Sequence, residues 1–155
     1  MVSMTDAPRP TPTIAEALDL ATQVNRLSHL LGRPYIRDYA AKTGLSLTEW
    51  RVFVRIVQHA GTSAAVIAAE SGLTAMTVSR AVGVLRDRGL VAAAPDARDA
   101  RRTQLTCTPE GQAVFDEAAP HAARTVGAIM SALSAEESAL FRVLLERIIA
   151  EADRH

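Results

Sequence analysis

Several arginines gather in one short segment of this chain, residues 96–102, which reads DARDARR. Arg98, Arg101 and Arg102 lie in this segment together with Asp99. An arginine at the tip of a hairpin can enter the minor groove of DNA, where narrow A/T tracts concentrate negative potential. Asp99 can orient such an arginine through a charge-assisted hydrogen bond. The alternative is a solvent-facing turn whose surface ion pairs have little energetic value.

A second group of side chains with recognition chemistry follows Thr74. Val78, Val82 and Leu85 recur at helical spacing and are expected to face inward. The exposed face at the start of this helix then carries five candidates: Ala75, Met76, Thr77, Ser79 and Arg80. The hydroxyls can donate to phosphates or base edges, and Arg80 can pair with guanine, worth about 1 to 3 kcal/mol of discrimination. Ala75 or Met76 could meet a thymine methyl group; the alternative is a solvated helix face.

The elements around these residues predict a helix-turn-helix. Ser63 is a candidate cap for a helix over 64–70, and Gly72 follows where a sharp turn needs a positive φ. Thr74 caps the next helix, which Gly89 stops. We count Ser63 and Thr74 among the candidate DNA contacts.

Two short strands and two helices are expected after this unit. Residues 90–94 and 102–107 form the strands of a hairpin wing. Thr108 and Pro109 are well placed to begin a long helix, which Pro120 should bend. Ser134 and Glu137 form a capping box for the last helix. The apolar series expected along the long helix is Ala118, Ala122, Val126, Ile129, Met130 and Leu133.

Before the helix-turn-helix, residues 1–12 predict a flexible arm rich in proline. A helix begins at Thr13 and is interrupted by Gly32 and Pro34. Thr48 is the expected cap of a second helix. The apolar face of that helix is expected to consist of Trp50, Phe53, Val54 and Val57.

The expected fold class is therefore mainly α with a small β-hairpin wing: a winged helix-turn-helix with N- and C-terminal dimerisation helices. We expect one compact domain, divided into N-terminal helices (13–45), a winged helix-turn-helix (46–107) and C-terminal helices (108–155). The last helix is apolar on more than one side. Together with the first helix, this is more apolar surface than a compact winged helix can cover, which predicts a homodimer.

Composition limits the remaining classes of function. Net charge is zero, but residues 46–111 carry +2 and residues 112–155 carry −3, so the mildly basic part coincides with the expected DNA-binding region. No apolar run approaches the roughly 20 residues of a membrane span, and the N-terminus does not resemble a signal peptide, so the cytoplasm is expected. The single cysteine, Cys107, is expected to pack on a strand; a redox sensor is the alternative.

An enzyme is not expected. The four histidines are scattered, and we find no metal-ligand spacing, nucleophile motif or glycine-rich phosphate loop. No catalytic residue, metal or cofactor is therefore assigned. A winged-helix module that binds protein instead of DNA is the main alternative, although such a wing has no need of two arginines at its tip.

These motifs together resemble the MarR (multiple antibiotic resistance regulator) family. The resemblance rests on the Asp-x-Arg-Asp-x-Arg pattern at 96–101, Thr108-Pro109-x-Gly111 behind it and Thr77-Val78-Ser79-Arg80 ahead, and it runs from about residue 13 to the C-terminus. It implies a homodimeric regulator of pseudo-palindromic operators, usually a repressor, often released by a small molecule. By the same resemblance, Arg101 is the minor-groove arginine, Asp99 its anchor, and residues 74–80 read the major groove. Gly83 departs from the usual polar pattern and should cost about 1 kcal/mol of helix stability.

The resemblance also implies an effector cleft between the terminal helices and the winged region, often for phenols or aromatic acids. Arginines there could pair with a carboxylate, and rings could stack on an aromatic acid. Trp50 lies on an apolar stripe, however, so a core role is the alternative for it. The candidate effector residues are Arg26, His29, Arg33, Tyr35, Tyr39, Trp50 and Arg51.

Overall fold

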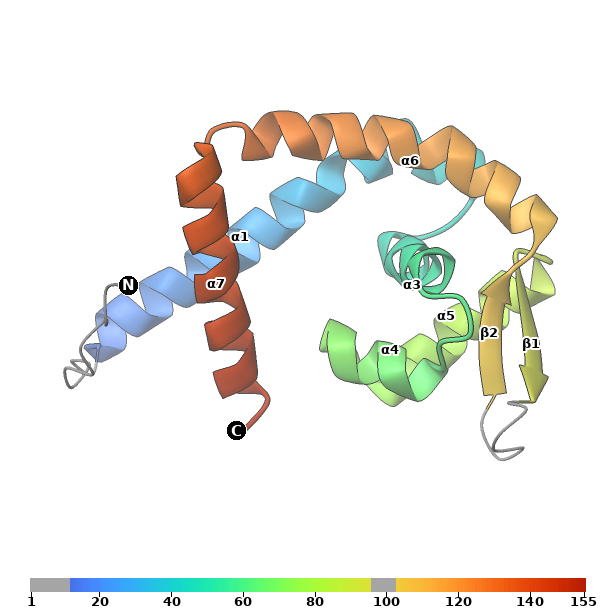
Figure 1. Ribbon diagram of the computed structural model, residues 1–155, viewed down its shortest axis with the longest axis horizontal. Coiled ribbons are helices and arrows are strands. Elements are labelled where there is room, and N and C mark those ends of the chain that lie inside the picture. Colours follow the sequence, from blue (N-terminus) through green and yellow to red (C-terminus); the bar gives the residue numbers. More distant parts are fainter. Residues whose placement is uncertain (1–11, 96–102) are drawn as a thin grey trace. The chain divides into compact units, whose positions relative to one another are not determined.

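The computed structural model describes residues 12–95 and 103–155 (Figure 1). Its contacts divide the chain into two compact units, Met1–Arg33 and Pro34–His155, where the sequence predicts one domain. In chain order the elements are α1 (Ile14–Asp38), α2 (Ala40–Thr43), α3 (Leu47–Gln58), α4 (Ala64–Ser71), α5 (Ala75–Asp87), β1 (Val91–Pro95), β2 (Thr103–Cys107), α6 (Pro109–Met130) and α7 (Ala135–Ala152). The fold is mainly helical with a small two-stranded sheet, as the sequence predicts.

Helix α1 is continuous, so the expected interruption at Gly32 and Pro34 is wrong. The helical register continues because Tyr35 and Tyr39, one turn apart, both bury their rings in the core. A proline in a helix removes one backbone hydrogen bond, and the buried rings offset that loss. The chain then forms the short α2 and turns at Gly44, whose φ of 63° favours glycine.

Helix α3 begins two residues earlier than the sequence predicts. Its cap is Ser46, not Thr48: the Ser46 hydroxyl accepts from the Glu49 amide, and the Glu49 carboxylate accepts from the Ser46 amide. This is a complete capping box. The expected apolar face is correct only in part, since the buried residues of this helix are Trp50, Val52, Phe53 and Ile56.

The helix-turn-helix forms as expected. Ser63 caps α4 by accepting from the Val66 amide, and Thr74 caps α5 by accepting from the Thr77 amide. Gly72 lies between the two helices with a φ of 65°, a conformation that residues with side chains rarely adopt. The turn therefore uses the one glycine available between the two helices.

Strands β1 and β2 pair antiparallel, from Val91 with Cys107 to Pro95 with Thr103. Each strand agrees with its expected range to within one residue at either end. Leu105 also pairs with Thr62, which ties the turn before α4 to the second strand. The hairpin is thus anchored to the helix-turn-helix at its base.

The two C-terminal helices begin at the expected caps, Thr108 and Ser134, and Ser134 forms the expected capping box with Glu137. Of the apolar series expected along α6, Ala118 is buried and Ile129 is exposed, and the other members are half-buried: Ala122, Val126, Met130 and Leu133. Helix α7 has no buried residue. Within the described residues, no helix has the length and apolar content to cross a membrane.

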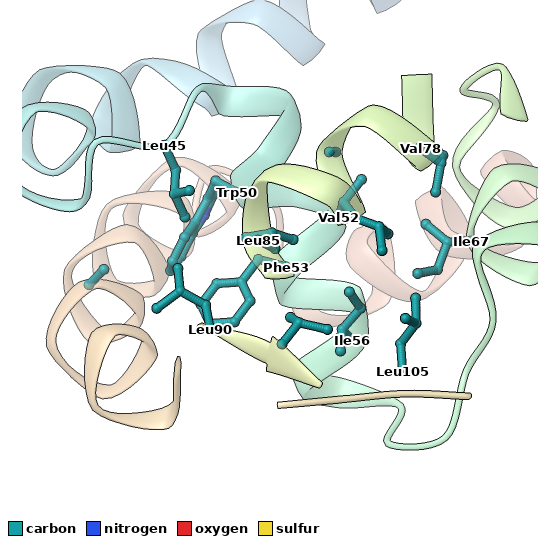
Figure 2. Close-up of a cluster of buried hydrophobic side chains, with 14 of the residues drawn as sticks. Leu45, Trp50, Val52, Phe53, Ile56, Ile67, Val78, Leu85, Leu90 and Leu105 are labelled. Carbon is teal, nitrogen blue, oxygen red and sulfur yellow. The ribbon is translucent and has the colours of Figure 1, made fainter. Parts of the chain in front are cut away.

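The core surrounds α3, which packs against α5, β2 and α6 (Figure 2). Phe53 and Ile56 of α3 are fully buried, as are Val78 and Leu85 of α5. Leu90 and Leu105 bring the hairpin into the same cluster. Because one cluster joins helices and hairpin, the recognition elements rest on a common rigid base.

Candidate nucleic-acid interface

Helix α5 buries one face and exposes the other. Val78, Val82 and Leu85 are buried, as the sequence predicts, and Ala81 joins them. Four of the five candidates at the helix start, Ala75, Met76, Ser79 and Arg80, are exposed, and Met76 is 64% exposed although it is apolar. The exposed face thus presents a hydroxyl, a guanidinium and two apolar side chains of different size, which suits the mixed chemistry of base edges in a major groove.

Thr77 differs from the other four candidates because it is half-buried. Its hydroxyl lies 2.8 Å from the hydroxyl of Thr74, and its amide donates to the same Thr74 oxygen at 3.2 Å. The two threonines therefore hold the first turn of α5 together. Both contribute to the helix start itself, in addition to any contact with a ligand.

Helix α4 is held against α3 by an ion pair that the sequence analysis missed. Arg55 of α3 donates to Glu70 of α4, 15 residues away. The Nε2 atom of His59 lies 3.2 Å from the Nη1 atom of the same guanidinium. Spacing along the sequence gave no signal for this contact, because it depends on how two helices cross. Ser63, the remaining candidate of this region, lies half-buried at the start of α4.

The wing candidates Arg98, Asp99, Arg101 and Arg102 lie outside the described residues. What the structure describes is the base of the wing, where the last strand pair joins Pro95 to Thr103. The segment that carries the arginines therefore connects the free ends of the two strands. Its expected roles remain predictions.

The effector candidates divide between the two units. Arg26, His29 and Arg33 belong to the first unit, which the structure describes by itself. In the second unit Tyr35 and Trp50 are buried, at 2% and 6% exposure, and their rings stack with centroids 4.6 Å apart. The rings of both residues are thus part of the core.

Phe115 of α6 completes this aromatic cluster and was not among the candidates. Its ring stacks on Trp50 at 5.9 Å and meets Phe53 edge-on at 6.3 Å. Phe115 lies three residues before Ala118, on the same helix face as the expected apolar series, so extending that series by one turn would have found it. The cluster links α1, α3 and α6 within the second unit.

A small polar network lies beside the aromatic cluster. The Tyr35 hydroxyl lies 2.6 Å from the Thr43 hydroxyl and 3.1 Å from the carbonyl of Leu45. Thr43 in turn donates to the carbonyl of Tyr39 at 3.1 Å. Burial raises the pKa of the Tyr35 phenol, so the ring stays neutral and its hydroxyl serves as a hydrogen-bond donor.

Tyr39 and Arg51 are the remaining effector candidates of the second unit. Tyr39 is buried, with its ring 5.3 Å from that of His121 and the Lys42 ammonium 5.3 Å from its centroid. Arg51 is exposed on α3. A hollow of about 90 Å³ next to Tyr39 is lined by Lys42, Thr43, Arg88, Val114, Glu117 and Ala118.

Cys107 is half-buried at the end of β2, and its thiol donates to the carbonyl of Thr108 at 3.4 Å. Burial is the main cause that raises the pKa of this thiol, and the charge of Asp116 adds to it. A raised pKa disfavours the reactive thiolate, which supports the packing role. In the described part of the chain, no three acidic, histidine or cysteine side chains group as a metal site.

The comparisons with known proteins agree with this geometry. Residues 43–102 match the MarR family model. A MarR/EmrR family transcriptional regulator from Acinetobacter sp. ADP1 has a TM-score of 0.79 at 22% identity, covering 90% of this chain and 98% of that one. Proteins of curated function give no sequence match.

Two further solved structures hold a bound ligand. PcaV from Streptomyces coelicolor, in complex with its natural ligand, has a TM-score of 0.70 at 24% identity, covering 93% of this chain and 99% of that one. CouR from Rhodococcus jostii RHA1, bound to p-coumaroyl-CoA, has a TM-score of 0.75 at 22% identity, covering 90% and 96%. At these identities the likeness shows the fold. Residues 43–102, which include the helix-turn-helix, are therefore similar to the MarR family, and the solved structures show the same fold over most of the chain.

Proposed function

We propose that this protein is a homodimeric transcriptional regulator that binds a pseudo-palindromic DNA operator and acts as a repressor. The observation that carries the proposal is the exposed face of α5, with Ala75, Met76, Ser79 and Arg80 on a helix whose other face is locked into the core. The backbone of a capped helix held in this way is already ordered, so only its exposed side chains lose freedom on binding.

In this proposal α5 enters the major groove, and Arg80 pairs with a guanine. Arg101 enters the adjacent minor groove, and Asp99 orients it, as in the resemblance described above. Ser63 contacts the phosphate backbone from the start of α4, with Arg98 and Arg102 adding contacts from the wing. The half-sites lie about one helical turn apart, near 10 bp, if the two protomers follow the usual geometry.

The homodimer is proposed from apolar side chains that the single chain leaves exposed. Exposed on α7 are Leu140, Val143, Leu144, Ile148 and Ile149. The first unit adds Ile14, Leu18, Leu20 and Val24 of α1. Burying such surfaces against a second copy supplies roughly 25 cal/mol for each Å² removed from water. Sedimentation equilibrium at micromolar concentration tests this, and a monomer there would contradict the dimer.

We further propose that a small aromatic acid or phenol releases the protein from DNA. The support is that PcaV and CouR, which share the fold, were solved with bound ligands: PcaV with its natural ligand and CouR with p-coumaroyl-CoA. The candidate contacts are Tyr39 and Arg51 in the second unit, where Tyr35 and Trp50 belong to the core, and Arg26, His29 and Arg33 in the first unit. A panel of benzoates, cinnamates and phenols should raise the melting temperature and weaken DNA binding. Failure of the whole panel would argue against this effector class.

The function is tested by fluorescence anisotropy on the DNA immediately upstream of the protein's own gene, with random duplex for comparison. Arg80→Ala and Arg101→Ala should each weaken operator binding by about 5- to 150-fold, because each removes a groove contact worth about 1 to 3 kcal/mol. Arg142→Ala, on the exposed surface of α7, is the matched control and should bind as wild type. Equal effects of all three variants would overturn the assignment, and no preference over random DNA would favour a protein-binding module.

A further inference from the structure

A polar hollow of about 300 Å³ lies at the base of the wing, beside the start of α4. It is lined from three elements: the turn after α3 (His59 to Ser63), helix α4 (Val66 and Glu70) and strand β2 (Thr103 and Gln104). No part of it belongs to the exposed face of α5 or to the aromatic cluster. This volume has ample room for one phosphate group.

The hollow has a rigid frame. The Gly61 amide donates to the carbonyl of Leu105 at 2.9 Å, and the Leu105 amide donates to the carbonyl of Thr62 at 2.8 Å. These two bonds fix the turn after α3 to β2 on both sides. The backbone of the hollow is therefore already in place when a ligand approaches, which lowers the entropy cost of binding.

The lining of the hollow suits an anion. Ser63 uses its oxygen to accept from the Val66 amide, so its hydroxyl hydrogen remains able to donate outward. Thr62 and Thr103 bring two more hydroxyls. Glu70 is the one acidic side chain of the lining, and its charge is matched by the ion pair with Arg55.

The protonation state of His59 determines the net charge of this hollow. Its Nε2 atom lies 3.2 Å from Nη1 of Arg55. A guanidinium can only donate, so this contact requires a neutral His59 that accepts at Nε2. The charged groups that face His59 among the described residues are Arg55 of α3 and Glu70 of α4, which offset each other. The hollow is thus neutral while His59 is neutral, and it carries one positive charge once His59 is protonated.

We propose that this hollow binds one phosphate group of the DNA backbone and that His59 makes this contact dependent on pH. Protonated, His59 gives up the bond from Arg55 and donates to a phosphate oxygen, with the hydroxyls of Ser63 and Thr62 beside it. DNA binding then takes up a proton at this site, and affinity rises as pH falls through the range in which histidine titrates. This inference rests on the proposed function, because it names a contact of the same DNA-binding surface.

The variant that tests the proposal is His59→Gln, whose amide oxygen can still accept from Arg55 but which cannot become charged. Wild-type protein should bind a duplex up to about tenfold tighter near pH 6 than near pH 8 at matched ionic strength, since one proton is coupled to binding. The salt dependence should also steepen by about 0.9 near pH 6, the slope of one extra phosphate contact. In His59→Gln both pH effects should disappear, with affinity close to that of wild type near pH 8.

His155→Gln is the matched control, because His155 is exposed at the end of the chain and pairs only weakly with Glu151. It should keep the pH response of wild type. An equal pH response in His59→Gln would overturn the proposal. Random duplex is measured alongside, since backbone contacts do not depend on sequence. A protein without operator preference that keeps a His59-dependent pH response would contradict the proposed operator function and support this site.

Nuclear magnetic resonance gives a second readout that does not depend on affinity. Adding a short duplex near pH 6 should move the ring resonances of His59, because the proposed phosphate contact changes the surroundings of the imidazole. The same NMR measurement with inorganic phosphate in place of DNA distinguishes a general anion site from a contact with the DNA backbone. If free phosphate shifts His59 and the duplex does not, the proposed contact with DNA is wrong.

Discussion

Replacing Gly111 with alanine tests how closely α6 approaches the turn between α5 and β1. A Cβ atom at this position would lie 2.2 Å from the carbonyl oxygen of Leu90 and 2.9 Å from the sulfur of Cys107. The same carbonyl accepts from the Thr108 amide at 3.1 Å, and the Thr108 hydroxyl donates to the carbonyl of Gly89 at 2.7 Å. The clash therefore falls on backbone that holds the start of α6 in place.

The size of the effect follows from two opposing contributions. Carbon and carbonyl oxygen do not normally approach closer than about 3.3 Å, so the methyl group must displace the backbone by about 1 Å. Overpacking of this kind costs about 1 to 3 kcal/mol, and rigid neighbours favour the upper end. Alanine regains about 1 kcal/mol over glycine within a helix. We expect a net loss of about 2 kcal/mol in the free energy of unfolding, or roughly 4 to 8 °C in melting temperature.

Urea unfolding followed by circular dichroism measures this loss, at one fixed protein concentration because a dimer's stability depends on concentration. Gly127→Ala is the matched control: it lies in the same helix, and a Cβ there meets nothing within 4 Å. It should be stabilised by about 0.5 to 1 kcal/mol. If Gly111→Ala proves as stable as Gly127→Ala, the close approach between α6 and Leu90 is wrong.

Three further variants or measurements test other parts of the structure. Gly83→Ala should stabilise the protein by about 1 kcal/mol in urea unfolding, because a Cβ on this residue of α5 meets nothing within 4 Å; a loss of stability would mean that a neighbour approaches there. Tyr35→Phe should cost about 1 kcal/mol in the same assay, since it removes the bonds to Thr43 and the Leu45 carbonyl, whereas an unchanged stability would show that the network is not formed. Burial raises the pKa of the Cys107 thiol, so iodoacetamide should label it more slowly at neutral pH than it labels the urea-unfolded chain. The raised pKa also means that its contribution to stability is present below the pKa of the unfolded thiol and is lost as pH rises through the folded pKa; equal labelling rates would contradict this.

Local signals in the sequence predicted the helix starts well. Ser63, Thr74, Thr108 and Ser134 all cap the helices expected of them. A cap depends on residues three positions apart, so its information lies within one turn. The error at α3 also follows from local chemistry, because Ser46 has a glutamate at the capping-box position and Thr48 does not.

Packing between elements was less predictable. A single apolar stripe was expected on α3, yet this helix packs against α5, β2 and α6 and therefore buries more than one face, including Val52 and Ile56. The pair of Arg55 with Glu70 and the stack of Trp50 on Phe115 depend on how helices cross, which periodicity along one helix does not encode. For the same reason the hollow around His59 has no counterpart in the sequence analysis.

The dense packing around α3 limits how an effector can act on α5. Helix α3 packs against α5. Phe53 and Ile56 of α3 are fully buried, and so are Val78 and Leu85 of α5. Sliding α5 alone would open cavities, and each large buried side chain that loses its packing costs about 2 to 5 kcal/mol. A typical allosteric coupling supplies only about 1 to 3 kcal/mol. We therefore expect an effector to move the winged helix as one body. Hydrogen exchange of the α5 amides should be unchanged by such a ligand, and a loss of protection confined to α5 would contradict this.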